Sequence, residues 1–311
     1  MFDRISDGLW WDKAWSLVDG CTPVSPACAN CWAATQTQMR ANHPNDKVRG
    51  RAEGLTADGH FNGRIRLNYE FLDKPLRTRK PTAWAVWNDL FHEDVPESFF
   101  RQTYEVMRQC PQHIFILLTK RPRIMAQVLN GYKGKMWPLP NVWLGVTAEN
   151  QQTANARIPF LLQTPAAVRF VSVEPMLGAI SLARWLPWDT FRKRIPGWVP
   201  NPAYRQGLHW VICGGESGPN ARPMHPDWVR SLRDQCLAAG TSFFFKQWGE
   251  WGRRKEAGLS LNGRQYGYWE NDEFQHQSMI GGGDYMVKVG KKAAGRLLDG
   301  REWLEIPEVG K

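Results

Sequence analysis

From residue 82 onward, short apolar runs alternate with longer amphipathic stretches, and this alternation limits the folds open to the chain. Six runs have the length and composition of buried strands: residues 82–87, 113–119, 141–147, 168–174, 209–215 and 241–247. An initial strand within residues 15–20 would make seven. The alternation predicts βα units around a parallel sheet. We therefore expect an α/β fold, a partial or full (β/α) barrel of six to seven parallel strands with helices outside.

Two of the intervening stretches carry the end signals of helices. Residues 96–110 open with Pro96, a residue that suits the first turn of a helix, and residues 225–240 close with Gly240, which suits a C-cap. Both stretches present one apolar face. They are the helices that we expect to cover the sheet.

Polar or small residues stand at the end of each of the six predicted strands. The residues at these ends are Asn88, Asp89, Thr119, Lys120, Arg121, Thr147, Glu149, Ser172, Glu174, Gly214, Gly215, Glu216, Lys246, Gln247 and Trp248. In (β/α) barrels the chemistry lies on the loops at the C-terminal ends of the strands. These residues are therefore expected to form the rim of one site. The alternative for any single one of them is that it only terminates its strand.

Three cysteines crowd together just after the initial strand. Cys21, Cys28 and Cys31 have the spacing C-x6-C-x2-C. Three thiolates on one short loop suit an iron–sulfur cluster that keeps one iron open for another ligand. Zinc is the alternative, with His43 or His60 as a fourth ligand, because structural zinc sites use four protein ligands. Plain buried thiols are the third interpretation.

The chain has a formal net charge of +10, from 40 Lys and Arg against 30 Asp and Glu. Ten of the basic residues lie between positions 40 and 80, within a basic insertion at about 33–81. A balance of this size favours a polyanionic partner such as nucleic acid. A solvated basic loop is the simpler alternative for the insertion.

The other three cysteines, Cys110, Cys213 and Cys236, are scattered singly through apolar stretches. This is not the pattern of a secreted disulfide framework, so a reducing cytoplasm is the expected compartment. The first residues lack the layout of a signal peptide, and no run approaches the roughly 18 apolar residues of a membrane span. We expect no membrane partner.

Beyond these patterns, the chain resembles a phage and bacterial family of predicted radical S-adenosylmethionine proteins, long listed as of unknown function and similar to spore photoproduct lyase. The resemblance is carried by WSLVDGCTPVSPACANCWA (15–33), NDLFHEDVP (88–96), LLTKRP (117–122), NVWLGVTAEN (141–150), RFVSVEPMLG (169–178), WVICGGESG (210–218), FFFKQWG (243–249) and VGKKAAGRLLDGREW (289–303). The cysteine spacing differs from the commonest radical-enzyme motif, which has three residues between its first two cysteines. Trp32 also stands where a tyrosine is common.

The resemblance implies a radical S-adenosylmethionine barrel over residues 1–251 and a C-terminal extension over 252–311 that packs on it. It implies two cofactors, a [4Fe–4S] cluster on Cys21, Cys28 and Cys31 and S-adenosyl-L-methionine on the open iron. An electron donor such as flavodoxin or ferredoxin would reduce the cluster.

Residue roles follow from the same resemblance. Asn88 and Asp89 would contact the methionine amino group, and the backbone of Gly214 and Gly215 would lie against adenine. Glu216 is a further candidate for cofactor binding. Candidates for the ribose and carboxylate contacts are Thr147, Glu149, Ser172 and Glu174. Candidates at the catalytic mouth are Lys120 and Lys246, with Arg121, Gln247 and Trp248 on the substrate.

The expected reaction begins when the cofactor is cleaved to a 5′-deoxyadenosyl radical that modifies a base in DNA. The resemblance to phage proteins and the net charge favour thymidine hypermodification, in which an amino-acid adduct of thymine is isomerised. Double-stranded DNA with modified thymine would be the partner, in the host cytoplasm if the chain is phage-encoded. The alternatives are a DNA photoproduct repair lyase and a non-catalytic zinc-bearing DNA-binding protein.

Overall fold

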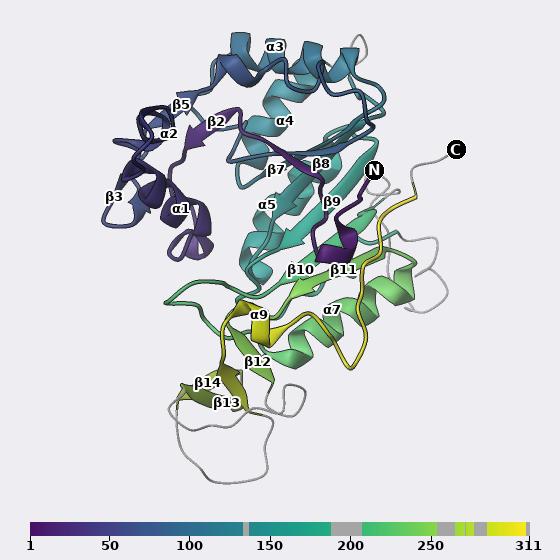
Figure 1. The fold of residues 1–311 in the computed structure, drawn as a ribbon. Helices are drawn as coiled ribbons and strands as arrows, with labels where there is room; N and C mark the ends of the chain where they lie inside the picture. Colours follow the sequence, from purple (N-terminus) through teal and green to yellow (C-terminus); the bar gives the residue numbers. More distant parts are fainter. Residues whose placement is uncertain (133–136, 188–206, 254–264, 271, 277–284, 309–311) are drawn as a thin grey trace.

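The structure is a computed structural model that describes the chain except for residues 133–136, 188–206, 254–264, 271, 277–284 and 309–311. Its main element is a curled half-barrel sheet of seven parallel strands in the order β1-β6-β7-β8-β9-β10-β11 (Figure 1). The strands are β1 (Lys13–Trp15), β6 (Ala83–Val86), β7 (Ile114–Thr119), β8 (Val142–Thr147), β9 (Val168–Val173), β10 (Trp210–Gly214) and β11 (Ser242–Gln247). The predicted α/β half-barrel and its six strands from residue 82 onward are confirmed.

The initial strand differs from its prediction. It pairs with β6 only over Lys13–Trp15, and the amide of Leu17 then donates to the carbonyl of Trp15 in a tight turn. The next strand, β2 (Val18–Gly20), leaves the sheet and pairs antiparallel with β5 (Ile65–Leu67). One apolar run thus contains two strands, because a turn that uses backbone groups alone leaves no sequence signal.

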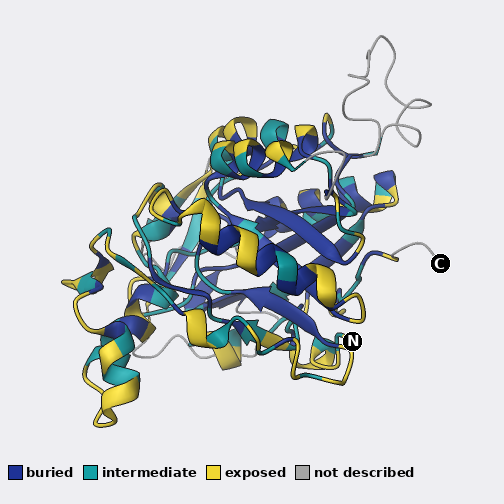
Figure 2. Ribbon diagram, turned by 90° about the horizontal axis from the view of Figure 1, so that it is seen from above, coloured by how far each residue is buried: buried dark blue, intermediate teal, exposed yellow. Residues whose placement is uncertain are grey.

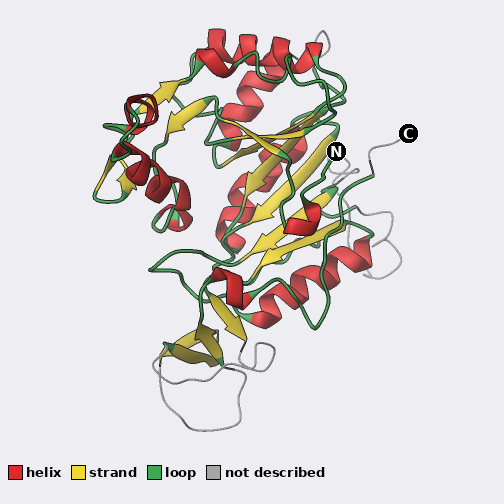
Figure 3. Ribbon diagram, in the orientation of Figure 1, coloured by secondary structure: helices red, strands yellow, loops and turns green. Residues whose placement is uncertain are grey.

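Helices cover the outer face of the half-barrel (Figure 3). They are α3 (Glu97–Gln109), α4 (Pro122–Gly131), α5 (Gln151–Gln163) and α7 (Pro226–Ala239). Pro96 is the N-cap of α3, and Gly240 ends α7 in the left-handed conformation with φ 65°. Both end signals in the sequence are therefore confirmed. Seen from above in Figure 2, the strands are buried and the helices expose only their outward faces.

The basic insertion forms two helices, a short antiparallel pair and a 3-10 turn beside β2. Its elements are α1 (Trp32–Ala41), α2 (Asp46–Ala52), β3 (Thr56–Ala57), β4 (His60–Phe61), β5 (Ile65–Leu67) and η3 (Tyr69–Phe71). Two short 3-10 turns precede it, η1 (Ile5–Asp7) and η2 (Pro26–Cys28). In Figure 1 this part projects from the end of the sheet toward which the strands point.

The C-terminal part forms an antiparallel sheet in the order β12-β15-β13-β14, followed by α9. The bounds are β12 (Trp251–Arg253), β13 (Tyr266–Glu270), β14 (Glu273–His276), β15 (Met286–Lys288) and α9 (Lys291–Ala294). After α9 the chain returns to β11, where the amide of Phe245 donates to the carbonyl of Trp303 at 2.8 Å. The end of the chain is thereby attached to the last strand of the half-barrel.

The inner face of the sheet is aromatic over the first part of β8, β9, β10 and β11. Trp143, Phe170, Trp210 and Phe244 form one buried cluster, with Trp210 edge-on to Trp143 and Phe244 at 5.8 and 6.2 Å between ring centroids. Residues from both ends of the chain, including Phe2, Trp10, Leu304 and Ile306, pack against this cluster. Successive residues of a strand alternate between faces, so the inner face continues through Thr147, Ser172 and Lys246 toward the carboxyl ends. The space over the aromatic part of the inner face is thus filled by residues of the chain itself, and the polar part lies nearer the carboxyl ends of the strands.

None of the helices in the described parts of the chain combines the length and apolar character that crossing a bilayer requires.

Gly145 lies opposite Phe170, and a Cβ at this position would come within 2.2 Å of the Phe170 ring. We expect Gly145→Ala to lower the free energy of unfolding by about 1–3 kcal/mol, because the ring must leave its packed position. Gly50→Ala, in α2 with no atom within 4 Å of the added Cβ, is the control and should be neutral or stabilising by up to about 1 kcal/mol. Urea unfolding measures both. Equal stabilities would contradict the tight packing of this face.

Candidate functional site

The cysteine loop, residues 21–31, follows β2 at the carboxyl ends of the strands. Cys21, Cys28 and Cys31 are all half-buried. The short turn η2 ends at Cys28, and Cys31 is the N-cap residue of α1. All six cysteines of the chain lie in its described part and are free thiols. The loop thus presents three thiols that are neither fully buried nor oxidised.

Arg121 holds one side of the cysteine loop. Its guanidinium donates to the Thr22 carbonyl at 3.0 Å and lies 3.7 Å from the Cys21 Sγ. The same group donates to Asp89 at 3.1 Å and to Glu93 at 2.7 Å. The side chains of Arg121 and Asp89 are only 4% and 8% exposed, so this is a buried ion pair that positions the start of the loop.

Both carboxylate oxygens of Asp89 already accept hydrogen bonds from neighbouring groups. Its carboxylate accepts hydrogen bonds from Thr119 Oγ1 at 2.7 Å and from the amides of Phe91 and Lys120. Together with Arg121, these donors show that Asp89 organises the ends of β6 and β7 as well as the cysteine loop. In the predicted contact, the methionine amino group would have to share this carboxylate with these partners.

Arg222 holds the other side of the cysteine loop. Its guanidinium donates to the Pro26 carbonyl at 3.0 Å and to Glu216 at 2.8 Å. Glu216 also accepts from the Asn30 side chain at 2.9 Å, and Asn30 donates in addition to the Asn220 carbonyl at 2.9 Å. The loop therefore spans the mouth of the half-barrel, from the end of β7 to the end of β10.

The charges around the loop act differently on two of the thiols. Burial raises the pKa of Cys21 to about 11, and the nearby Asp89 carboxylate adds to this rise while Arg121 opposes it. For Cys28, burial also raises the pKa, but the Lys120 charge and hydrogen bonds from Val24 and Ser25 outweigh it, so the net pKa is lowered. In the metal-free protein, Cys28 is thus the thiol more readily ionised.

A polar rim on the inner face continues beyond the aromatic cluster. Glu174, just after β9, pairs with Lys246 Nζ at 2.9 Å and accepts from Ser172 Oγ at 3.3 Å and from Trp10 Nε1 at 3.3 Å. Three of the predicted cofactor and mouth residues are therefore in direct contact. They connect β9 with β11, and Trp10 is an addition that the strand-end pattern did not indicate.

Two buried acceptor atoms near the strand ends have no hydrogen-bond partner in the described part of the chain. Glu149 is fully buried and pairs through Oε2 with Arg157 at 2.9 Å, while its Oε1 is unpartnered. Gln247 donates to Ser217 Oγ at 3.1 Å, while its Oε1 is unpartnered. A buried acceptor without a donor is costly, so a donor from a water molecule or from a ligand would stabilise either atom.

Several other predicted residues already serve the packing of the protein. Asn88 adopts φ 57° and donates to the Val18 carbonyl at 2.7 Å, so it connects β6 to β2. A Cβ at Gly215 would lie 1.9 Å from the carbonyl oxygen of Trp248, and one at Gly214 would lie 2.9 Å from a Glu174 oxygen. Glycine is therefore favoured at these two positions because the protein's own backbone and the Glu174 carboxylate approach them closely.

Two further predicted residues are buried in the same region. Trp248 is 2% exposed, packs edge-on to Phe245 and donates through Nε1 to the Leu297 carbonyl at 2.8 Å. Thr147 is likewise buried, and its carbonyl accepts from Arg157 at 2.9 Å. The indole of Trp248 therefore lies in the core, and the predicted stacking on a substrate base would require it to leave this packing.

Sequence reasoning missed the residues that hold the cysteine loop from outside the strand ends. They are His92 and Arg222, which contact the loop directly, and Glu93, which acts through Arg121. Asn30, within the loop, was missed as well. His92 Nε2 lies 2.8 Å from Thr22 Oγ1, which adds a contact on the Arg121 side. Only Arg222 had a sequence signal for a role at the site, because it follows the predicted site residue Glu216 by six positions, and this signal was weak.

The fit of a metal cofactor rests on the donor set. Among the described residues, no three His, Cys, Asp or Glu side chains are placed close enough together to hold a metal ion. The predicted fourth zinc ligands, His43 and His60, are exposed, and His43 Nδ1 accepts from the amide of Asn45. The three thiols of the cysteine loop likewise do not converge in the structure. They are nevertheless free, lie on one loop and are close to the cations Lys120 and Arg121, and thiolates are the ligands of iron–sulfur clusters.

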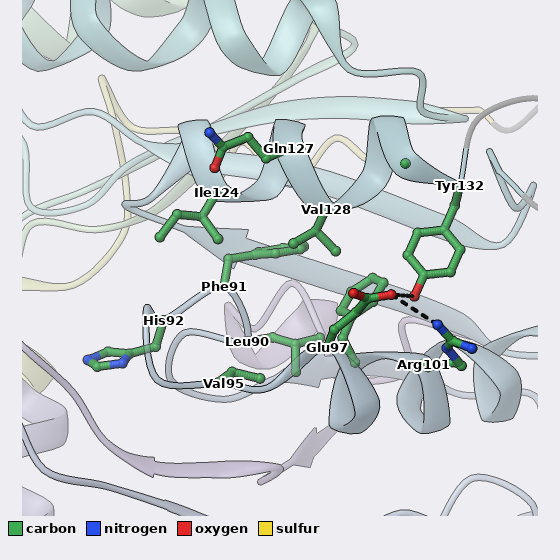
Figure 4. A pocket seen from close by; sticks show the side chains of 12 residues that line it. Leu90, Phe91, His92, Val95, Glu97, Arg101, Ile124, Gln127, Val128 and Tyr132 are labelled. Carbon is green, nitrogen blue, oxygen red and sulfur yellow. Dashed lines mark hydrogen bonds and ion pairs between the residues drawn. The ribbon is translucent and has the colours of Figure 1, made fainter.

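A groove of about 920 Å³ lies beside the loop that follows β6 (Figure 4). Its lining is mostly apolar, with Phe91 and Val128 among its residues, and Glu97 accepts from Tyr132 and Arg101 at its edge. The groove contains none of the predicted site residues. It lies between α3 and α4, outside the mouth of the half-barrel.

Comparisons with known proteins give one family. Residues 6–307 match the model of the family described as "Protein of unknown function (DUF5131)". Searches of curated proteins and of solved structures find no match to the chain.

The buried pair of Arg121 and Asp89 generates a stability prediction. We expect Arg121→Met to lower the free energy of unfolding by about 3–5 kcal/mol, because it leaves a buried carboxylate without its partner. The control is Arg108→Met, which removes an exposed partner of Glu105 and should cost less than about 1 kcal/mol. Urea unfolding of both variants measures the difference. A similar small loss in both would contradict the role of Arg121 in holding the loop.

The unequal thiols generate a reactivity prediction for the metal-free protein. At pH 8, iodoacetamide should label Cys28 at least about tenfold faster than Cys21, because alkylation requires the thiolate. Lys120→Gln should slow the labelling of Cys28, since loss of the cation raises its pKa, and Lys292→Gln, on α9, should not. Peptide mass spectrometry over time follows both thiols. Faster labelling of Cys21 would contradict the electrostatics described above.

Proposed function

The chain belongs to the family of proteins of unknown function DUF5131, and we propose that it is a radical S-adenosylmethionine enzyme that modifies a base in DNA. One observation carries the proposal. Three free, half-buried thiols lie on a single loop that Arg121 and Arg222 hold across the carboxyl ends of a seven-stranded parallel half-barrel. This is the end at which (β/α) barrels perform their chemistry.

Cys21, Cys28 and Cys31 would hold a [4Fe–4S] cluster. When bound, the cluster would supply the electron that splits S-adenosylmethionine, and the three-thiol donor set would leave one iron open to that cofactor. The chain's own contribution is electrostatic. Lys120 beside Cys28 and Arg121 beside Cys21 offset the negative charge of the thiolates.

S-adenosylmethionine would lie along the polar rim between β8 and β11. The unpartnered oxygens of Glu149 and Gln247 would accept from its hydroxyl or ammonium groups, which removes the cost of burying them alone. Ser172 and Glu174 lie in the same rim, and Lys246 holds the Glu174 carboxylate in place. The aromatic floor of Trp143, Phe170 and Trp210 excludes water below the rim.

DNA is the proposed substrate because the chain carries a formal net charge of +10, with a concentration of basic residues in the insertion next to the cysteine loop. Within this class, we favour the isomerisation of an amino-acid adduct of thymine. Such an isomerisation leaves the oxidation state of the adduct unchanged: one hydrogen atom would pass from the adduct to the 5′-deoxyadenosyl group of the cofactor, and one would be returned from it to the rearranged adduct. Flavodoxin or ferredoxin would reduce the cluster.

Anaerobic reconstitution with iron, sulfide and reductant tests the proposal. The wild type should become brown, absorb near about 400 nm and form 5′-deoxyadenosine from S-adenosylmethionine. Cys28→Ala should lose the absorbance and at least about 90% of the product, because the loop then offers too few thiols. Cys110→Ala, which removes a buried thiol outside the loop, is the matched control and should retain both.

Two other outcomes would redirect the assignment. A colourless protein that binds zinc and never forms 5′-deoxyadenosine would overturn the radical chemistry. An active protein that reverses thymine photodimers in irradiated DNA, and leaves adduct-bearing DNA unchanged, would be a repair lyase instead. Nucleoside analysis of DNA digests separates these two reactions.

A further inference from the structure

A cavity of about 370 Å³ lies between β2 and the basic insertion, where α1, α2 and η3 line it. It is lined by Ser16, Asp19, Thr37, Arg40, Lys47, Val48, Arg51, Ala52 and Phe71. Neither the cofactors nor the reaction proposed above use any of these residues. The lining combines basic side chains, hydroxyl groups and a small apolar wall.

Arg51 is fixed in this cavity. Its Nε and Nη2 donate to Asp19 Oδ2 at 3.0 and 2.7 Å, and its guanidinium lies 4.4 Å from the centre of the Phe71 ring. Asp19 also accepts from Asn68 at 2.8 Å. The only carboxylate of the lining is therefore neutralised by an arginine that it orients, which prevents it from repelling an anion.

Arg40 and Lys47 supply the charge that remains. Neither forms an ion pair with a carboxylate in the described part of the chain, and Arg40 lies over the Trp87 ring at 5.9 Å. With three basic side chains and one carboxylate, the formal charge of the lining is 3 − 1 = +2. A cavity with this charge and with hydroxyl donors from Ser16 and Thr37 matches a phosphate group.

The aromatic residue of the cavity does not favour a base. The Phe71 ring already carries Arg51 at 4.4 Å and the Lys74 ammonium at 3.6 Å from its centre. A ring covered by two cations is a poor stacking platform, so recognition falls to the charged groups. The ligand expected here is a phosphate, and the volume allows an attached sugar.

The cavity is next to the cysteine loop. Asp19 lies on β2, two residues before Cys21, and α1 begins with Trp32 directly after Cys31. Trp32 is 51% exposed and packs edge-on to Trp87, the ring over which Arg40 lies. A phosphate in the cavity would therefore be held by the same elements that carry the three thiols.

We propose that the cavity around Arg40, Lys47 and Arg51 binds a backbone phosphate of DNA and thereby sets the position of the strand whose base enters the mouth. That the phosphate belongs to DNA rests on the proposed function, whereas the inference that the cavity binds a phosphate rests on the cavity alone. Contacts of this kind position a protein on nucleic acid without reading its sequence.

The test is DNA binding by the full-length, cluster-free protein, measured by fluorescence anisotropy with a labelled duplex. The double variant Arg40→Gln/Lys47→Gln should bind about tenfold to hundredfold more weakly, with a salt dependence reduced by a slope of about 2. The control, Arg101→Gln/Arg108→Gln on α3, has the same change in net charge and should lose less than about threefold. Circular dichroism and thermal unfolding confirm that both variants fold.

Two results would overturn the inference. An equal loss of affinity in the two double variants would show that net charge, and not the cavity, attracts DNA. Binding of free thymidine monophosphate that depends on Arg40 and Lys47, with unchanged DNA affinity, would keep a phosphate site and exclude the DNA source. The anisotropy assay needs no cluster and the 5′-deoxyadenosine assay needs no DNA, so failure of this inference and failure of the proposed function are separately visible.

Discussion

Parallel pairing of the seven strands is the constraint on which the rest of the structure depends. The register from β1 to β11 brings all seven carboxyl ends to one curved edge, although the residues there lie as far apart in sequence as Trp15 and Gln247. Along the inner face, aromatic rings give way to polar groups toward that edge. Because Trp10 and Leu304 pack against the rings, ligands can meet the sheet at its polar end.

Two arginines then fix the cysteine loop across this edge. Arg121 reaches the loop from the end of β7, and Arg222 reaches it from beyond β10. Each is paired with a buried carboxylate, Asp89 or Glu216, and the attraction within each pair offsets part of the desolvation cost of the buried charges. The same charges make the thiols unequal, since Cys21 lies beside a carboxylate and Cys28 near Lys120.

The basic surplus of the chain is arranged rather than uniform. Asp19 on β2 orients Arg51 of the insertion, whereas Arg40 and Lys47 have no carboxylate partners among the described residues. On α3, by contrast, Arg101 and Arg108 each pair with a glutamate one turn away. Positive charge without a carboxylate partner is thus found beside the cysteine loop, whereas these arginines of the outer helix α3 are balanced by its own glutamates.

The sequence by itself determined the strands from residue 82 onward, the ends of α3 and α7, and the placement of Asp89, Arg121 and Glu216 at strand ends. These features are local, since periodic apolar residues and capping residues act on their own segment. Only the tertiary structure decided that β1 stops at Trp15.

Long-range contacts were also beyond the sequence. Asn30 meets Glu216 across 186 positions, and Arg121 meets Thr22 across 99. The burial of Trp248 depends in the same way on the returning C-terminal segment. The physical reason is that such partners are selected by the curvature of the sheet and the packing of distant segments, for which no local pattern of residues carries a signal.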